Sequence, residues 1–295
     1  MVDSQLKDII CRAIDMHVHI GPEIIPRRFT ASSLEKSETG RLRGAVLKNH
    51  FYSTVPLAEE SEAFAEYGSL VLNWSMGGLN PEAIRAASYI AKRRFVVWLP
   101  TINAANFLEK SEYELAPEWC SGQNIQPRNA ADVPGISLLT ARGNLTKKAK
   151  DVAIAVSEAN AVLATGHVST SESVAIADFA LRQGVGAVIV THPIYQRIEM
   201  PLSTQQWLAA RGCYMEVCYS MFSIDNISIK RLARQITAIG PERTILSSDV
   251  GQLQNVSPSE ALLQFCKLLV KKGIPVKWIE TMLVTNPQAI LEGKQ

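Results

Sequence analysis

The chain has 295 residues, 47% hydrophobic and 20% charged, which is enough for one large α/β domain with a sizeable core. Its net charge is +2 and its Lys and Arg residues are scattered, which argues against nucleic acid or an anionic membrane as the main partner. No apolar run is long enough to span a bilayer, and five cysteines without a CxxC pair suit free thiols in the cytoplasm, where we expect the protein.

Short apolar, β-branched runs alternate along the chain with segments of helical period. The predicted strands cover residues 13–19, 44–50, 70–76, 95–101, 161–167, 186–192, 213–220 and 244–251. The predicted helices cover residues 54–67, 81–93, 146–159, 171–183 and 229–239. Eight strands that alternate with helices predict a parallel sheet closed into a (β/α)8 TIM barrel. An open doubly wound sheet is the rival, but the chain has no glycine-rich phosphate turn.

One stretch after the fourth predicted strand breaks this alternation. Residues 103–133 combine glutamates and prolines with little periodicity, and in a barrel they would lie over the C-terminal ends of the strands as a lid or lining loop. Residues 135–140 are a candidate for an extra strand. Since no repeat or linker divides the chain, we expect a single domain over residues 1–295 that carries this insertion.

All five histidines fall at the C-terminal ends of predicted strands. His17 and His19 end the first, His50 ends the second, and His167 and His192 end the fifth and sixth. A parallel barrel gathers these strand ends around one mouth, so we expect the imidazoles to lie close together. The pattern indicates a metal site or a proton-transfer site.

The first strand reads Asp15-Met16-His17-Val18-His19. Because side chains alternate along a strand, Asp15, His17 and His19 are predicted to share one face, where the two imidazoles can bind one metal. Asp15, one step deeper, could orient a ligand or a water molecule. Asp249, at the tip of the eighth strand, supplies the carboxylate that a hydrolytic metal site needs. Each of these residues, taken singly, could equally be a hydrogen-bonded core or turn residue.

The HxH pair on strand one, the histidines on strands five and six, and the aspartate on strand eight together resemble the amidohydrolase superfamily of metal-dependent (β/α)8 hydrolases. The matching residues are His17, His19, His167, His192 and Asp249. Residues 285–289, TNPQA, are similar to the TxNPA opening of the last helix in many members. The resemblance implies one or two divalent cations per chain, the more buried one on the HxH pair. It also implies that His167 and His192 bind a second metal or act on substrate, and that Asp249 binds the buried metal and shuttles a proton.

The fourth predicted strand lacks the Lys or Glu that bridges two metals in many binuclear members. Instead, Lys48 and His50 lie two residues apart on strand two, and so share a face beside the HxH pair. Lys48 could be a carbamate that bridges two metals, a cationic substrate anchor, or an ion-pair partner of Asp15. His50 could be an extra metal ligand or a substrate contact. The number of metals is therefore open.

Three residues on the loops after strands one and six are further candidates for substrate contacts, namely Arg27, Tyr195 and Arg197. An arginine there can bind a carboxylate or phosphate through two parallel hydrogen bonds, although a solvated surface arginine is the simpler interpretation for any one of them. Glu216, in the seventh predicted strand, is interpreted as a paired core carboxylate.

The sequence thus predicts a metal-dependent hydrolase in which Zn²⁺, or else Mn²⁺ or Fe²⁺, activates water to attack an ester, lactone, amide or phosphoester bond. Asp249 is predicted to take the proton, and His167 or His192 to stabilise the oxyanion. One alternative is a single-metal, non-oxidative decarboxylase of the same superfamily, which the missing strand-four bridge favours. The other is a metal-binding protein without turnover. We expect a small-molecule substrate and leave homo-oligomerisation open.

Overall fold

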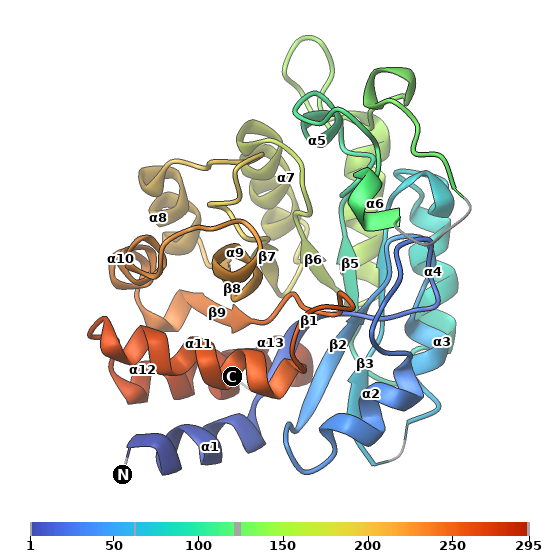
Figure 1. Cartoon of the computed structure of the whole chain (residues 1–295). Coiled ribbons are helices and arrows are strands. Elements are labelled where there is room, and N and C mark those ends of the chain that lie inside the picture. The colour runs from blue at the N-terminus through green and yellow to red at the C-terminus, as the bar shows by residue number, and fades with distance from the viewer. Residues whose placement is uncertain (1, 62, 121–124, 294–295) are drawn as a thin grey trace.

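A computed structural model describes residues 2–61, 63–120 and 125–293 of the chain (Figure 1). Its strands are β1 (Ile14–His19), β2 (Gly44–Lys48), β3 (Ala65–Tyr67), β4 (Ser69–Val71), β5 (Val96–Trp98), β6 (Val162–Ala164), β7 (Val188–Val190), β8 (Tyr214–Cys218) and β9 (Thr244–Ser247). All of the pairings between these strands are parallel.

The helices of the described residues surround these strands (Figure 1). They are α1 (Val2–Arg12), α2 (Ala31–Glu38), α3 (Val55–Ala58), α4 (Pro81–Ile90), α5 (Ala105–Leu108), α6 (Lys147–Glu158), α7 (Thr170–Arg182), α8 (Leu202–Ala210), α9 (Ser220–Ser223), α10 (Ile229–Ile239), α11 (Pro258–Lys271), α12 (Val276–Glu280) and α13 (Asn286–Glu292). No helix in this part of the chain is long and apolar enough to cross a membrane.

The strands follow the order of a TIM barrel in two hydrogen-bonded groups, β1-β2-β3 and β4-β5-β6-β7-β8-β9. The chain just after β9 returns to β1, where the His19 N–H donates to Val250 O over 2.8 Å and the Asp249 N–H donates to His17 O over 2.9 Å. At the other junction the Ser69 hydroxyl of β4 donates to Leu47 O of β2 over 2.5 Å. The predicted α/β barrel is confirmed.

The third barrel position corrects the sequence prediction. It is filled by β3 and β4, which cover residues 65–71, whereas a helix was expected over 54–67 and a strand over 70–76. The helix ends at Ala58, and residues Trp74–Met76 form a 3₁₀ turn. Gly68 lies between the two strands. A Cβ at this position would lie 2.4 Å from the Cα of Val55, so only glycine lets α3 pack this closely.

The other predicted strands are found, but most are shorter than expected. The observed strands stop before His50, Thr101, His167 and His192, which lie in the first residues of the following loops. The predicted helices over 81–93, 146–159, 171–183 and 229–239 correspond to α4, α6, α7 and α10. The candidate strand over 135–140 is wrong, because Ile136 and Leu139 make only isolated bridges, to Ala104 and Leu145.

The C-terminal helix opens where the sequence motif predicted, but it continues from the helix before it. The last helix, α13, begins at Asn286 within the 285–289 motif, but without a side-chain cap, since a π-helical turn, Thr281–Thr285, joins α12 directly to it. Such a turn accommodates Pro287, which has no N–H to donate. The Asn286 side chain instead donates to the carbonyls of Pro241 and Thr244, both over 2.7 Å. These bonds fasten the last helix to the start of β9.

Glu66 of β3 belongs to the barrel wall and is not a candidate metal ligand, so it allows a separate test of what stabilises the fold. It is buried, and its Oε1 has no hydrogen-bond partner among the described residues. Desolvation and the nearby Glu35 raise its pKa to about 7, against an opposing effect of Arg93. Because this pKa exceeds that of the unfolded chain, stability is lost as the pH rises from about 4.5 to about 7.

Glu66→Gln should therefore raise the melting temperature by a few degrees at pH 8 and leave it nearly unchanged at pH 4. Differential scanning calorimetry at both pH values measures this difference. Glu109→Gln, at an exposed position on the loop after α5, is the matched control and should have no such pH dependence. An equal effect of Glu66→Gln at both pH values would contradict the assigned cause.

Candidate active site

A β-bulge divides β1 just before its histidines. Asp15 pairs with Ala45 of β2, but Val18 pairs with Leu47, so β1 has one more residue than β2 between these pairs. A bulge of this kind changes which face the following side chains occupy. The side chains of β1 therefore do not alternate regularly between the two faces of the sheet.

The bulge corrects the predicted face of Asp15. Met16 packs among the side chains that fill the barrel interior, and His17, the next residue, also faces inward with its ring centroid 4.6 Å from that of Trp98. Asp15 instead accepts hydrogen bonds from the backbone N–H groups of His17 (3.2 Å) and Ser248 (3.0 Å). The prediction that Asp15, His17 and His19 share one face is wrong because of the extra residue. Asp15 holds the bulge and the end of β9 together.

His17, His19 and Asp249 form a compact group of potential metal ligands at the mouth of the barrel. Asp249 Oδ1 lies 3.1 Å from His17 Nε2 and 3.0 Å from His19 Nε2. The Ser220 hydroxyl donates to Asp249 Oδ2 over 2.7 Å and so fixes the plane of the carboxylate. One ligand atom from each of the three residues lies within 4.8 Å of the others, a spacing that a single cation can bridge.

Glu216 of β8 contacts His17 from the barrel interior and is completely buried. Its Oε1 lies 3.0 Å from His17 Nδ1 and also accepts from the Ser247 hydroxyl over 2.7 Å. A carboxylate that contacts the far nitrogen of an imidazole fixes the tautomer and orientation of the ring, an arrangement typical of metal sites. Glu216 is thus a paired core carboxylate, as predicted, and its partner is a candidate metal ligand.

Lys48 lies inside this group rather than beside Asp15. Its Nζ is 2.9 Å from His17 Nε2 and 4.2 Å from the centre of the Trp98 ring. No ion pair links Lys48 to Asp15, so that one of its three candidate roles is wrong. Desolvation lowers the pKa of Lys48, against the attraction of Asp249 and Glu216. A lysine with a lowered pKa is nucleophilic enough to form a carbamate.

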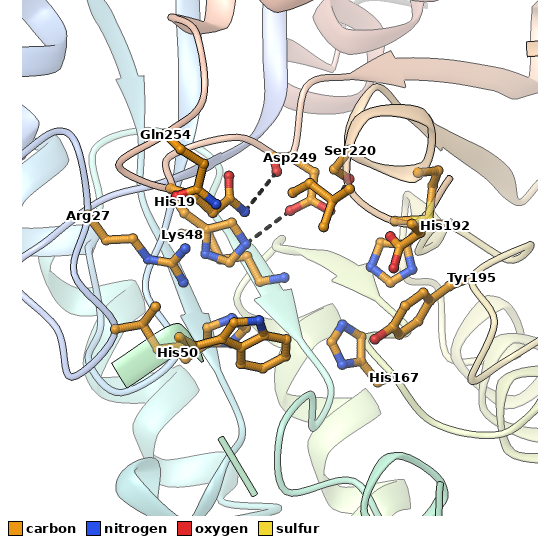
Figure 2. A pocket seen from close by; sticks show the side chains of 16 residues that line it. His19, Arg27, Lys48, His50, His167, His192, Tyr195, Ser220, Asp249 and Gln254 are labelled. Carbon is orange, nitrogen blue, oxygen red and sulfur yellow. Dashed lines mark hydrogen bonds and ion pairs between the residues drawn. The ribbon is translucent and has the colours of Figure 1, made fainter. Parts of the chain in front are cut away.

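The remaining histidines complete one continuous cluster. Successive ring centroids are 4.8 Å apart for His50 and His19, 5.2 Å for His19 and His17, 6.1 Å for His17 and His192, and 5.1 Å for His192 and His167. Figure 2 shows His19, His50, His167 and His192 lining the same pocket. The structure therefore brings together all five histidines, as the strand ends predicted.

Burial keeps four of these imidazoles uncharged. Desolvation lowers the pKa values of His19, His50 and His167 well below their usual range, and lowers that of His192 to about 4. A neutral imidazole is the form that binds a metal or donates a hydrogen bond to a developing anion. The shifts thus suit either role.

Asp249, by contrast, is ionised. Desolvation alone would raise its pKa, but His17 and His19 outweigh this effect and hold the pKa well below its usual range. Asp249 and His192 also adopt positive φ angles of 51° and 24°, values that residues other than glycine rarely take. Such backbone strain is concentrated at functional sites.

The predicted substrate contacts divide into two groups. Arg27, His50 and Tyr195 line the pocket, whereas Arg197 does not. The Arg197 guanidinium donates to the Tyr195 hydroxyl and stacks over Phe107 at 4.7 Å, so it positions Tyr195 instead. A direct contact between Arg197 and substrate stays a prediction.

Other pocket residues were not identified from the sequence. Trp119, in the described part of the 103–133 insertion, lines the pocket, as do Ser220 and Asp225 after β8. Glu23, between β1 and α2, fixes Arg27 in the pocket wall. Trp119 could have been selected as the large aromatic side chain of the predicted lid. The others carry no local signal, because only the tertiary fold brings them to the mouth.

A family model described as a family of unknown function, DUF6282, matches residues 12–216. The chain belongs to this family. The match covers most of the barrel and includes all five histidines. None of the curated proteins matches the sequence.

Solved structures share the fold over nearly the whole chain. The probable dipeptidase PvdM from Pseudomonas aeruginosa is 10% identical, with a TM-score of 0.61 over 98% of this chain and 97% of that one. An amidohydrolase from Pseudomonas aeruginosa is 8% identical, with a TM-score of 0.59 over 98% and 97%. A TatD homologue from Escherichia coli is 13% identical, with a TM-score of 0.56 over 96% and 99%. At these identities the likeness establishes the fold.

Proposed function

We propose that this protein is a metal-dependent hydrolase that activates water on one or two divalent cations to cleave an ester, lactone, amide or phosphoester bond of a small molecule. The observation that carries the proposal is the convergence of His17, His19 and Asp249 on one buried point. The names of two structural neighbours, a probable dipeptidase and an amidohydrolase, are in keeping with it.

The residues present fit a divalent cation. The Nδ1 atoms of His19, His167 and His192 are buried and have no hydrogen-bond partner among the described residues. Buried polar atoms are rarely left without a partner, so a bound ligand, ion or water is expected at these rings. His17, His19 and Asp249 would hold the first cation, and His167 and His192 a second one. An imidazole-rich set of this kind suits Zn²⁺, although Mn²⁺ and Fe²⁺ bind similar ligands.

A bound cation supplies Lewis acidity, which lowers the pKa of water and polarises the electrophile. The ionised Asp249 accepts the proton of the attacking water at Oδ2, the oxygen that Ser220 holds in place, and returns it to the leaving group. Where only the first cation is bound, the neutral rings of His167 and His192 can instead donate hydrogen bonds to the oxyanion that develops in the transition state. Glu216 keeps the His17 ring oriented throughout.

The first test is the metal content per chain, measured by inductively coupled plasma mass spectrometry on wild type, His17→Ala and Lys48→Ala after metal loading. Two equivalents that fall to one or fewer in Lys48→Ala would indicate a bridged, binuclear hydrolase. One equivalent that survives Lys48→Ala but is lost in His17→Ala would indicate a mononuclear site. Absence of metal from every sample would overturn the proposal.

Activity is then measured on a panel of esters, lactones, amides and phosphoesters with the loaded enzyme. Turnover of any class that is lost in His17→Ala supports the proposed reaction. Release of CO₂ from carboxylated ring compounds, without hydrolysis of the panel, would identify a mononuclear decarboxylase instead. Glu109→Gln, at an exposed position that does not line the pocket, is the control and should match wild type in metal content and turnover.

A further inference from the structure

Arg27 is built into the wall of the catalytic pocket. Its side chain is only 3% exposed, and that of Glu23, which pairs with it, is fully buried. Arg27 Nε donates to Glu23 Oε1, while Glu23 Oε2 accepts from the His50 backbone N–H over 2.9 Å. Glu23 thus couples the guanidinium to the tip of strand β2 and offsets the cost of burying its charge.

The outer edge of this guanidinium is available to a ligand. Among the described residues, Arg27 makes its hydrogen bond through Nε alone, so Nη1 and Nη2 are left without a protein partner. Both groups belong to a side chain that lines the pocket (Figure 2). A planar fork of N–H donors matches the two oxygens of a carboxylate or phosphate.

The neighbouring Arg28 shows that this placement is specific. Arg28 is exposed and donates to the backbone carbonyl of Asn255, with its guanidinium 5.4 Å from the centre of the Phe29 ring. It does not line the pocket. Two adjacent arginines therefore have different environments, and only one of them faces the imidazole cluster.

The charges elsewhere in the pocket favour an anion at Arg27 over other positions. Asp225 lies near Tyr195, and Asp249 contacts His17 and His19, so an anionic group placed beside either carboxylate would be repelled. In Figure 2, Arg27 lies on the side of the pocket away from His167 and Tyr195. An anionic substrate would thus be bound in one orientation.

We propose that the substrate carries a carboxylate or phosphate group and that Arg27 binds this group through Nη1 and Nη2 while the scissile bond lies at the imidazole cluster. The inference rests on the proposed hydrolase function and deepens it by naming the substrate class. Arg27 is a specificity-determining residue in this account, and Glu23 positions it.

The test compares wild type with Arg27→Gln, Arg27→Lys and Arg28→Gln, each checked for folding by circular dichroism and for equal metal content. Isothermal titration calorimetry measures the Kd of succinate, methylphosphonate and the neutral succinamide. Arg27→Gln should weaken binding of at least one anion by about ten-fold or more, because it removes the cation that would pair with the bound anion in a buried site. Arg27→Lys should recover part of the loss, and Arg28→Gln should stay within about two-fold of wild type.

The two anions distinguish the two chemistries, since preferential loss of succinate indicates a carboxylate and preferential loss of methylphosphonate a phosphate. Arg27→Gln leaves the buried Glu23 without its partner, so the double variant Glu23→Gln/Arg27→Gln provides a second test in which both charges are removed. Unchanged anion binding in both variants would overturn the inference.

Kinetics separates this inference from the proposed function. On matched esters with and without a distal carboxylate, wild type should prefer the anionic one, and Arg27→Gln should raise its KM with little change in kcat. Equal turnover of both esters would reject the anion subsite while leaving the hydrolase function intact. Anion binding that depends on Arg27 in a metal-loaded protein without hydrolytic turnover would reject the function but not the subsite.

Discussion

Asp249→Asn should lower kcat by about 10³-fold while the protein still folds. Asparagine keeps the shape of the side chain and an oxygen that can face His17 Nε2 and His19 Nε2, which lie 3.1 and 3.0 Å from Asp249 Oδ1. It cannot take the proton of the attacking water, and it removes a negative charge from the proposed metal site. The loss should therefore appear mainly in kcat, with a smaller effect on metal content.

The measurement is steady-state kinetics on the best substrate of the panel, with metal content determined on the same samples. Ser220→Ala is the matched comparison, because it removes only the hydroxyl that donates to Asp249 Oδ2 over 2.7 Å. We expect it to lower kcat by about ten-fold, since the carboxylate loses orientation but not its proton affinity. Activity of Asp249→Asn within ten-fold of wild type at full metal loading would show that another residue handles the proton.

The barrel and its imidazole cluster could be predicted because both depend on regular features of the sequence. Alternation of apolar strands with amphipathic helices specifies parallel pairing, and parallel pairing brings all the strand ends to one mouth. His50, His167 and His192 reach the pocket even though the observed strands end before them, because the first loop residues still lie at that mouth. Errors of two or three residues in the strand boundaries thus left the site intact.

The bulge in β1 could not be predicted from the same pattern. The alternation of Asp15-Met16-His17-Val18-His19 fits an unbroken strand, and only the register with β2 shows the extra residue. Register is set by contacts between strands, so a single strand's sequence does not reveal it. The consequence is a different function for Asp15, which hydrogen-bonds the backbone of His17 and Ser248 instead of facing the site.

The pairing of Glu216 with His17, and Glu23 itself, were missed for a related reason. Glu216 contacts His17 from β8, and Glu23 contacts Arg27 within a loop that has no regular pattern. Both carboxylates are buried only because the folded barrel closes over them. Residues that fix an active site from behind are therefore found from the packed structure and not from spacing along the chain.

Gly251→Ala should destabilise the fold by at least about 3 kcal/mol and disturb His19. Gly251 has a φ of +139°, and a Cβ there would lie 2.1 Å from the carbonyl oxygen and 2.7 Å from the Cβ of His19. The clash is with backbone of β1, so relief requires the strand that carries the HxH pair to move. The variant should consequently lose both stability in urea unfolding and metal content.

Gly212→Ala measures the loss of stability that backbone strain causes without such a steric clash. Gly212 also has a positive φ, +102°, but nothing lies within 4 Å of a Cβ built there. It should cost only about 1–2 kcal/mol, the strain of an L-residue in a left-handed conformation, and should keep its metal. The difference between the two variants then reports how closely the segment after β9 packs on β1. Equal losses of stability in both, with metal retained in both, would show that this contact does not position His19.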